Sequence, residues 1–275
     1  MIANAVVSIQ KNPPAFEEWA RWHIQVCGFS DLFVFNDGGE IQVPSDLKKN
    51  ITVFPLQGVW FPQNGQARQM NLYNMWLYQS FGKFARALFI DDDEYLVLPE
   101  GKTVDEYYMD FLGDRGLQWV FYTSEENADA PKDSVIRRFT HRKSRADKTV
   151  KMMLEMVTQE QNYVENAAMF VCPHCLASMK YRRMMTWYDV YDNERSGPEN
   201  NVDIDVQNVP YIAHFYTKTR PEFDAKLRRG RPDTDNPQFQ YWHENMKPTM
   251  ERLWDERSVG DVEDRTLLDR LDSLK

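Results

Sequence analysis

The chain has 275 residues and a formal net charge of −9, with 42 acidic side chains against 33 lysines and arginines. Hydrophobic residues make up 42% of it, which excludes a disordered polymer and supplies a core for one large domain or two small ones. The acidic balance argues against a nucleic-acid-binding surface over the whole protein. No apolar run approaches the roughly 18–20 residues of a membrane span, and the N-terminus lacks the basic region of a signal peptide. We therefore expect a soluble, cytoplasmic protein.

The first third of the chain alternates short apolar runs with helical patterns. The pattern predicts strands over 5–9, 31–37, 51–56 and 86–90, and helices over 15–26 and 66–81. Strand, helix and strand joined by short polar loops are typical of a doubly wound, mostly parallel sheet. Ligands of such sheets bind outside the carboxyl ends of the strands.

The remainder of the chain is predicted to continue the same fold. Further strands are expected over 117–126, 134–142 and 210–219, and the tail from Phe239 onward is mostly helical in pattern. Residues 191–208 form a long polar loop, and long loops on α/β scaffolds are often functional. We expect one α/β domain over 1–235, with a helical C-terminal extension over 236–275 packed on it.

Four consecutive acidic residues, Asp91 to Glu94, follow the predicted strand 86–90 directly. Successive side chains of a strand point in opposite directions, so an Asp-x-Asp pair at its end spreads its carboxylates. Such oxygen ligands suit Mg²⁺ or Mn²⁺, which use one or two carboxylates together with substrate phosphates. The alternative is a solvated acidic turn. Apolar runs on both sides bring the cluster back against a core, where uncompensated charge is costly, and this favours a bound cation.

Several separated segments resemble one family, glycosyltransferase family 92 and its relatives. The opening, residues 8–37, is similar to the opening of that family. There, a strand is followed by Lys-Asn-Glu, then by Glu-Trp-x-x-x-His, then by a turn with Gly, and a second strand ends in Asn. The matching positions are Lys11, Asn12, Glu18, Trp19, His23, Gly28 and Asn36.

Three later segments complete the resemblance, which spans about residues 5–235. FIDDDEYLVL (89–98) resembles the family's Asp-x-Asp-Glu-Phe segment, with Tyr95 in place of Phe. TVKMM (149–153) resembles its Val-Lys-x-Ile element through Lys151. HFYTKTRPEFDAKLRRG (214–230) is similar to its signature beginning His-Tyr-x-x-Lys-Ser, with Phe215 for Tyr and Thr219 for Ser. The ordered set is specific, although no single motif decides.

The resemblance implies a GT-A fold, a Rossmann-like mixed, mostly parallel sheet flanked by helices. It also implies a hexosyl- or pentosyltransferase that moves a sugar from a nucleotide-sugar donor, a UDP-sugar first of all, to a hydroxyl of a glycan. The reaction would use Mn²⁺ or Mg²⁺ and invert the anomeric carbon. Animal and plant members carry an N-terminal membrane anchor, and this chain looks more like the soluble viral and bacterial members.

The resemblance also implies roles for residues around the diphosphate. Asp93 would contact the metal, with Asp91 as the other member of the Asp-x-Asp pair, while Asp91 or Asp92 would face the donor ribose or sugar. His214 would complete the metal or diphosphate site, or alternatively cap the following helix. The donor-binding candidates are Gln10, Lys11, Asn12, Asn36, Gln66, Arg68, Asp91, Asp92, Lys151 and Lys218.

The general base is expected on the acceptor side, opposite the leaving group. The loop 191–208 carries several carboxylates just before the strand that ends at His214, which is the usual place for the base in this fold. Asp203 or Asp205 is the candidate, against the alternative that both are merely solvated.

Two other function classes compete with a glycosyltransferase. The acidic cluster could belong to a metal-dependent phosphodiesterase or nuclease, which would need further carboxylate or histidine ligands. A non-catalytic nucleotide-sugar-binding module would keep the fold without turnover.

The Cys-Pro-His-Cys stretch at 172–175 invites a zinc interpretation. One Cys-x-x-Cys without a second ligand pair is a weak zinc signal, and we expect structural thiols. His174 is an acceptor-side or donor-side candidate by the resemblance. The basic run 137–148 has few aromatic residues among its charges, so a solvated loop is preferred to a nucleic-acid site.

Overall fold

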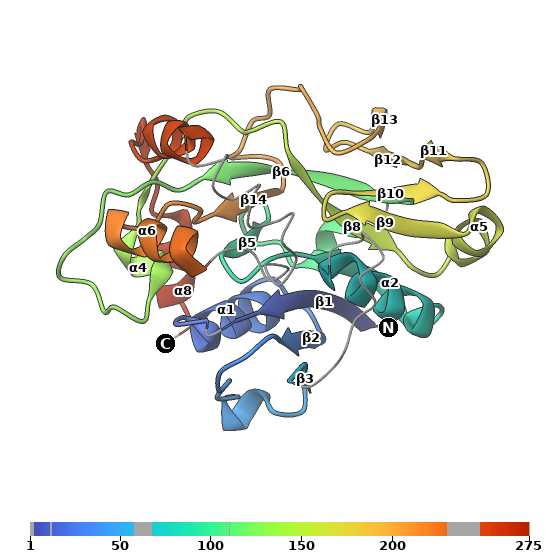
Figure 1. Cartoon of the computed structure of the whole chain (residues 1–275), viewed down its shortest axis with the longest axis horizontal. Helices are drawn as coiled ribbons and strands as arrows, with labels where there is room; N and C mark the ends of the chain where they lie inside the picture. The colour runs from blue at the N-terminus through green and yellow to red at the C-terminus, as the bar shows by residue number, and fades with distance from the viewer. Residues whose placement is uncertain (1–2, 12, 58–67, 110, 230–247, 275) are drawn as a thin grey trace.

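The computed structural model describes residues 3–11, 13–57, 68–109, 111–229 and 248–274 (Figure 1). The parallel half of its main sheet has the strand order β3-β2-β1-β4. These strands are β1 (Ala3–Gln10), β2 (Asp31–Asn36), β3 (Ile51–Pro55) and β4 (Phe84–Phe89). They correspond to the four strands predicted in the first third of the chain.

The other half of the sheet mixes strand directions. β8 (Val150–Glu155) runs antiparallel between β4 and β6 (Arg115–Phe121). β14 (Tyr211–His214) pairs in parallel with β6 and antiparallel with β5 (Glu94–Val97), and β12 (Thr186–Tyr188) and β13 (Glu194–Ser196) extend the far edge. The predicted fold class, a mixed and mostly parallel sheet flanked by helices, is confirmed.

The strand order reverses beside β1. The chain passes from β1 to β2 and β3 on one side, and then returns to place β4 on the other side of β1. Because β1 and β4 are parallel, Gln10 at the end of β1 and Asp91 just after β4 lie at the same edge of the sheet, where the strands end. Such a reversal is where open α/β sheets bind ligands, because the connections leave on opposite faces and open a crevice.

Alternation along the strands builds a core on each face of the sheet. Val6 and Leu88 face one cluster, which includes side chains of α1 (Phe16–Arg21), the π-helix η1 (Trp22–Val26), α3 (Val104–Tyr108), α4 (Val135–Arg138) and α8 (Thr266–Asp272). Ala87 and Phe89 face the other, which includes side chains of α2 (Arg68–Ser80), α5 (Glu160–Asn166), β9 (Ala168–Cys172) and β10 (Cys175–Ser178). The exposed strand β11 (Arg183–Met184) pairs with β10 outside this cluster. A strand buried on both faces reads as a continuous apolar run, as 87–90 does.

The remaining described elements are short or peripheral. They are η2 (Ser45–Leu47), β7 (His141–Arg142) paired with β15 (Val262–Glu263), α6 (Arg220–Arg229) and the helical residues 248–257. Figure 1 shows α4, α6 and α8 gathered at one end of the sheet, opposite α2 and α5. In the part of the chain that the structure describes, no helix combines the length and apolarity required to cross a bilayer.

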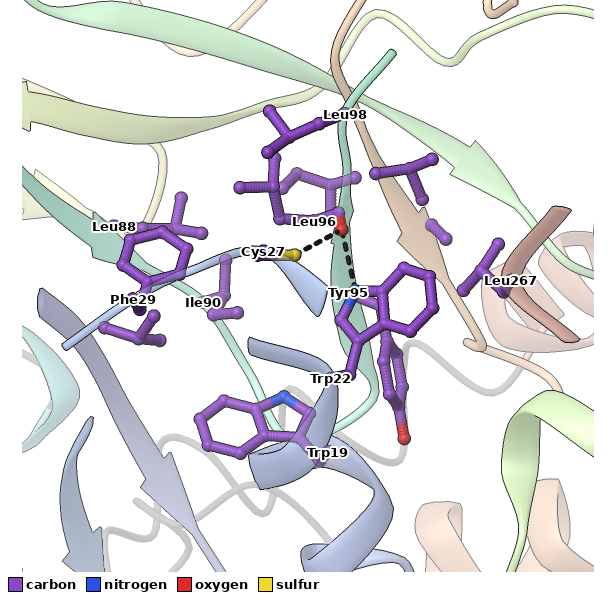
Figure 2. Close-up of a cluster of buried hydrophobic side chains, with 14 of the residues drawn as sticks. Trp19, Trp22, Cys27, Phe29, Leu88, Ile90, Tyr95, Leu96, Leu98 and Leu267 are labelled. Carbon is purple, nitrogen blue, oxygen red and sulfur yellow. Dashed lines mark hydrogen bonds between the residues drawn. The ribbon is translucent and has the colours of Figure 1, made fainter. Parts of the chain in front are cut away.

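Buried side chains of α1, of η1 and of the residue that follows η1 donate hydrogen bonds to the backbone of β5. Figure 2 shows Trp22 and Cys27 pointing at the carbonyl of Leu96, to which Nε1 and Sγ donate at 2.7 and 3.2 Å. Nε1 of Trp19 donates to the carbonyl of Glu94 at 3.0 Å. The strand that begins with Glu94 is therefore fixed by side chains as well as by its ladder.

The predicted strand over 134–142 is wrong for most of its length. Residues 135–138 form α4, and only His141 and Arg142 belong to a strand. The carboxylate of Glu18 accepts hydrogen bonds from the amides of Val135 and Ile136 at 2.9 and 3.0 Å, and the hydroxyl of Ser134 caps the same turn. A buried carboxylate from a distant helix satisfies the free N–H groups of this short helix, which overrides the local β pattern.

Asp114 gives the fold a pH dependence. It is buried before β6, and its Oδ1 accepts hydrogen bonds from the amide of Glu155 at 3.0 Å and from the hydroxyl of Tyr163. Burial raises the pKa of Asp114 to about 7 in spite of both bonds. Since an unfolded aspartate titrates near 3.9, the folded state binds more protons between these values, and stability falls as the pH rises through that window.

Asp114→Asn keeps the acceptor oxygen and removes the charge. We expect it to be about 2 kcal/mol more stable than the unaltered protein near pH 8, with a smaller gain near pH 5. Melting temperatures across this range measure the difference. Asp46→Asn, at an exposed carboxylate paired with Arg21, is the control and should show no gain at the higher pH. Identical pH profiles for Asp114→Asn and the unaltered protein would contradict the assignment.

Candidate functional site

The candidate site is built around the acidic turn, residues Asp91–Glu94, between β4 and β5. The amide of Glu94 donates to the carbonyl of Asp91 at 3.3 Å, which closes the turn. In the next strand pair Glu94 lies directly opposite His214, and the amide of Phe215 donates to the carbonyl of Asp93 at 2.9 Å. The sheet itself therefore brings His214 to the acidic turn across a long stretch of sequence.

Lys151 neutralises one side of the acidic turn. It is fully buried on β8, with Nζ 2.7 Å from Oδ2 of Asp91 and 3.2 Å from Oε2 of Glu94. Burial opposes its charge, but the two carboxylates raise the pKa of Lys151 above its usual range. Burial likewise opposes ionisation of Asp91, and Lys151 nevertheless holds the pKa of Asp91 below its usual range.

Glu94 keeps its proton more readily than its neighbours. Its side chain is fully buried, and burial together with the charges of Asp91 and Asp93 raises the pKa of Glu94 to about 8 in spite of Lys151. At neutral pH the charge of Lys151 is therefore paired mainly with Asp91.

A second lysine holds Asp93. Nζ of Lys226, from α6, lies 2.8 Å from Oδ2 of Asp93, and Nε2 of His214 lies 3.4 Å from Oδ1. Burial opposes ionisation, but Lys226 and His214 hold the pKa of Asp93 well below its usual range. The sequence argument for a cation assumed uncompensated charge, whereas lysines from two other elements compensate it.

Among the described residues, Asp92 forms none of these ion pairs. Burial and the charge of Asp93 raise the pKa of Asp92 to about 6, while Lys218 and Lys226 oppose the shift. Lys218 has a φ of +50°, a left-handed conformation that non-glycine residues adopt at some cost. Lys218 lies in the loop between β14 and α6, and its charge acts on Asp92.

His214 is enclosed by aromatic rings. Its ring centroid is 4.4 Å from that of Trp119 and 5.3 Å from that of Phe121. Burial lowers the pKa of His214 although Asp93 opposes the change, so the ring is held toward its neutral form. Its Nδ1 has no hydrogen-bond partner in the described structure and lies 3.9 Å from Oε1 of Glu94, which has none either. The neutral ring is the form that binds a metal.

The acidic turn fits a divalent cation that is shared with a ligand. Adjacent ligands of an octahedral ion with bonds of about 2.1 Å are about 3 Å apart, and the 3.4 Å between Asp93 Oδ1 and His214 Nε2 suits that spacing. Among the described residues, no group of three or more His, Cys, Asp and Glu side chains is arranged to hold an ion. Among the described residues, the protein therefore supplies no closed cage for an ion at the acidic turn.

The ends of β1 and β2 border the same edge. Gln10 is almost fully buried, and its Oε1 has no hydrogen-bond partner in the described structure. Lys11 is half-buried just beyond it. Asn36 is engaged in its own turn, where Nδ2 donates to the carbonyl of Gly39 at 2.9 Å and Oδ1 accepts from the amide of Gly38 at 3.1 Å. Of these, Gln10 offers the clearest unused acceptor.

Three further residues were predicted to bind the nucleotide-sugar donor, and only one of them, Arg68, is among the described residues. Asn12 and Gln66 lie outside the described residues. Arg68 pairs with Asp37, at the end of β2, and its NH2 group donates to the carbonyl of Leu56 at 3.2 Å. Arg68 thus links the first turn of α2 to the ends of β2 and β3.

The two candidates for the base sit in a loop with its own hydrogen bonds. Oδ1 and Oδ2 of Asp205 accept from the amide of Gln207 at 3.2 Å and from Nδ2 of Asn208 at 2.6 Å. The bond from Asn208 is the main reason that the pKa of Asp205 is lowered. Asp203 is exposed in the same loop. The role of either residue as the base stays a prediction.

Three further residues contact the groups of the site. Nε2 of Gln69 donates to Oδ1 of Asp91 at 2.7 Å, the ring of Trp119 packs at a tilt against that of His214, and Lys226 holds Asp93. Lys226 belongs to the segment that resembles the family signature, so its spacing from His214 was an available signal. Gln69 and Trp119 carry no such signal, because a polar helix start and a strand tryptophan are common.

Comparison with known proteins adds little to this geometry. No protein-family model matches the chain, and no curated protein matches it. The chain is similar to a crystal structure described as a glucose-1-phosphate thymidylyltransferase from Bacillus anthracis in complex with sucrose, with 10% identity and a TM-score of 0.32. The match covers 59% of this chain and 75% of that chain. So loose a similarity carries no argument about function.

Proposed function

We propose that this protein is a metal-dependent glycosyltransferase with a GT-A fold, which moves a sugar from a nucleotide-sugar donor, a UDP-sugar first of all, to a hydroxyl of a glycan with inversion. The observation that carries the proposal is the convergence of Asp93, His214 and Lys226 at the edge where the strand order reverses. That place combines a carboxylate and a neutral imidazole with two further cations, Lys151 and Lys218. Such a set of groups suits a diphosphate and its counter-ion.

The chain's own residues would divide the work as follows. Asp93 and His214 would hold a Mn²⁺ or Mg²⁺ ion, with Asp91 as the neighbouring carboxylate. When bound, that ion would act as a Lewis acid that neutralises charge on the diphosphate leaving group. Lys226 and Lys218 would bind phosphate oxygens. The unpartnered Oε1 of Gln10 would accept a hydrogen bond from an N–H or hydroxyl group of the nucleotide sugar. Asp203 or Asp205 would take the proton of the acceptor hydroxyl.

The competing functions make different demands on the same acids. A two-metal phosphodiesterase or nuclease needs carboxylates free to bridge two ions about 4 Å apart. Lys151 and Lys226 already pair with Asp91 and Asp93, which supports a single shared ion instead. A non-catalytic module would bind the donor and leave it intact.

A panel of sugar nucleotides with Mn²⁺ tests the proposal. Saturation-transfer NMR should detect binding of at least one nucleotide sugar, and slow hydrolysis of that donor should release the nucleoside diphosphate. Binding without hydrolysis or transfer would favour the non-catalytic module. Cleavage of a generic phosphodiester without sugar-nucleotide turnover would favour the nuclease. Failure of every nucleoside diphosphate to bind would remove both sugar-nucleotide interpretations.

A further inference from the structure

Two cysteines face each other across a tight hairpin at the edge of the candidate site. β9 ends at Cys172 and β10 begins at Cys175, and these two residues are paired across the antiparallel ladder with only Pro173 and His174 between them. The two Sγ atoms are 2.9 Å apart. Paired residues of antiparallel strands have Cα atoms about 4.5–5.5 Å apart, which lies within the range of roughly 4.4–6.8 Å that a disulfide spans. A short movement of the sulfurs would join them.

The two thiols differ in the way that an attacking and a resolving cysteine differ. The hydrogen bond with Cys175, helped by the backbone N–H groups of His174 and Cys175, lowers the pKa of Cys172 to about 7 against its burial. The contact with Cys172 and burial together raise the pKa of Cys175 above its usual range. Cys172 is half-buried, whereas Cys175 is buried. A thiolate is the nucleophile in disulfide exchange, so Cys172 is the reactive member.

Cys27 provides a contrast within the same chain. It is fully buried, donates its Sγ hydrogen bond to the carbonyl of Leu96, and has its pKa raised by burial (Figure 2). Buried thiols of this kind are inert. The reactivity of Cys172 is therefore a property of the hairpin and not of cysteines in this protein generally.

The hairpin also touches the wall of the candidate site. Nδ1 of His174 lies 2.8 Å from the carbonyl of Val150, the residue before Lys151. The ring of His174 meets that of Trp119 edge-on at a centroid distance of 5.0 Å. Trp119 in turn packs on His214 and lies 5.8 Å from Nζ of Lys151. One ring thus separates the cysteine turn from the groups that hold the acidic turn.

We propose that Cys172 and Cys175 form a reversible dithiol–disulfide site, and that its state sets the position of His174 against Trp119. The oxidant is a small-molecule disulfide. The Cys172 thiolate attacks one of its sulfurs and expels a thiolate; Cys175 then gives up its proton and attacks Sγ of Cys172, expelling the second thiolate. Two electrons pass to the small molecule, which leaves as two thiols, and one Sγ–Sγ bond forms in the protein. The consequence for ligand binding rests on the proposed function, whereas the redox site itself does not.

A redox titration of the folded, full-length chain tests the site. The protein is equilibrated at graded ratios of reduced to oxidised glutathione, the free thiols are trapped with N-ethylmaleimide, and the intact mass is measured. We expect two trappable thiols to disappear together, while Cys27 stays reduced and is trapped after unfolding. In Cys175→Ser a mixed disulfide should persist on Cys172, and Cys172→Ser should stay largely unmodified. A lasting mixed disulfide in the unaltered protein, an intermolecular dimer, or thiols masked by a bound metal would each overturn the proposal.

A second measurement tests the link to the acidic turn. Histidine NMR signals of the reduced and oxidised chains should differ at His174 and His214, and the affinity for UDP with Mn²⁺ should change several-fold. Neither should respond to glutathione in the Cys172→Ser, Cys175→Ser double variant. Unmoved histidine signals with equal UDP affinity would overturn the link. An intact redox transition with no UDP binding in either state would instead count against the proposed function alone.

Discussion

Replacing Asp93 by asparagine is expected to reduce donor hydrolysis and sugar transfer by roughly 10²–10³-fold, the size of loss measured when one group that stabilises transition-state charge is removed. Asparagine keeps the shape of the side chain and removes the charge that pairs with Lys226 and faces His214. The Mn²⁺ dependence of UDP binding should weaken with it. Initial rates at saturating Mn²⁺ and calorimetric titration of UDP, with and without the metal, measure the two effects.

The control for this variant is a carboxylate away from the acidic turn. Asp46→Asn removes an exposed charge paired with Arg21 and should leave the rates unchanged. Asp93 is buried and paired with Lys226, so Asp93→Asn is expected to lower the stability of the fold, and circular dichroism checks that the variant remains folded under the assay conditions. An Asp93→Asn protein with the full rate and undiminished metal dependence would exclude Asp93 from the proposed metal site.

Replacing Lys151 by methionine is expected to destabilise the fold by about 3–5 kcal/mol, the range measured when one partner of a buried ion pair is removed. Methionine fills the space of the lysine stem but leaves Asp91 and Glu94 without their shared cation. The side chain of Lys151 is fully buried and that of Asp91 is 35% exposed, so water can replace only part of the lost charge. Urea denaturation measures the change in the free energy of unfolding.

Asp91→Asn in the Lys151→Met background separates charge from packing. Because Asp91 is the ionised partner at neutral pH, its neutralisation should recover on the order of 1–3 kcal/mol, the size of coupling between contacting groups. Asp91→Asn alone should cost less than Lys151→Met. If the double variant is no more stable than Lys151→Met, the loss comes from packing, and the electrostatic account of the acidic turn is wrong.

The parallel half of the sheet was predictable because its determinants are local. Strands such as 87–90 are apolar on both faces, and the helical spacing of Phe16, Trp19 and Ala20 is visible in sequence. The strand over 134–142 failed for the opposite reason. Its helical start depends on Glu18, more than a hundred residues away, and no window of sequence contains both partners.

The acidic turn was found from sequence, but the groups that neutralise it were only partly assigned. Lys151 and Lys226 come from β8 and α6, and their distances to the acids depend on the strand order. His214 was placed next to the acids by the resemblance alone. The structure adds a direct reason, since β14 pairs with the strand that begins at Glu94. Asp203 and Asp205 remain predictions, because a solvated loop carries no packing that would fix their role.

The anchoring of β5 has a consequence for the thermodynamics of binding. Indole N–H groups of Trp19 and Trp22 and the thiol of Cys27 hold the carbonyls of Glu94 and Leu96, and the amide of Phe215 holds that of Asp93. The backbone of the acidic turn is thus ordered before any ligand arrives. A cation or diphosphate that binds there pays little conformational entropy to organise the backbone. The free energy of association should then depend mainly on how the ligand replaces Lys226 and water at the acidic turn. Backbone hydrogen exchange in β5 should change little when the ligand binds.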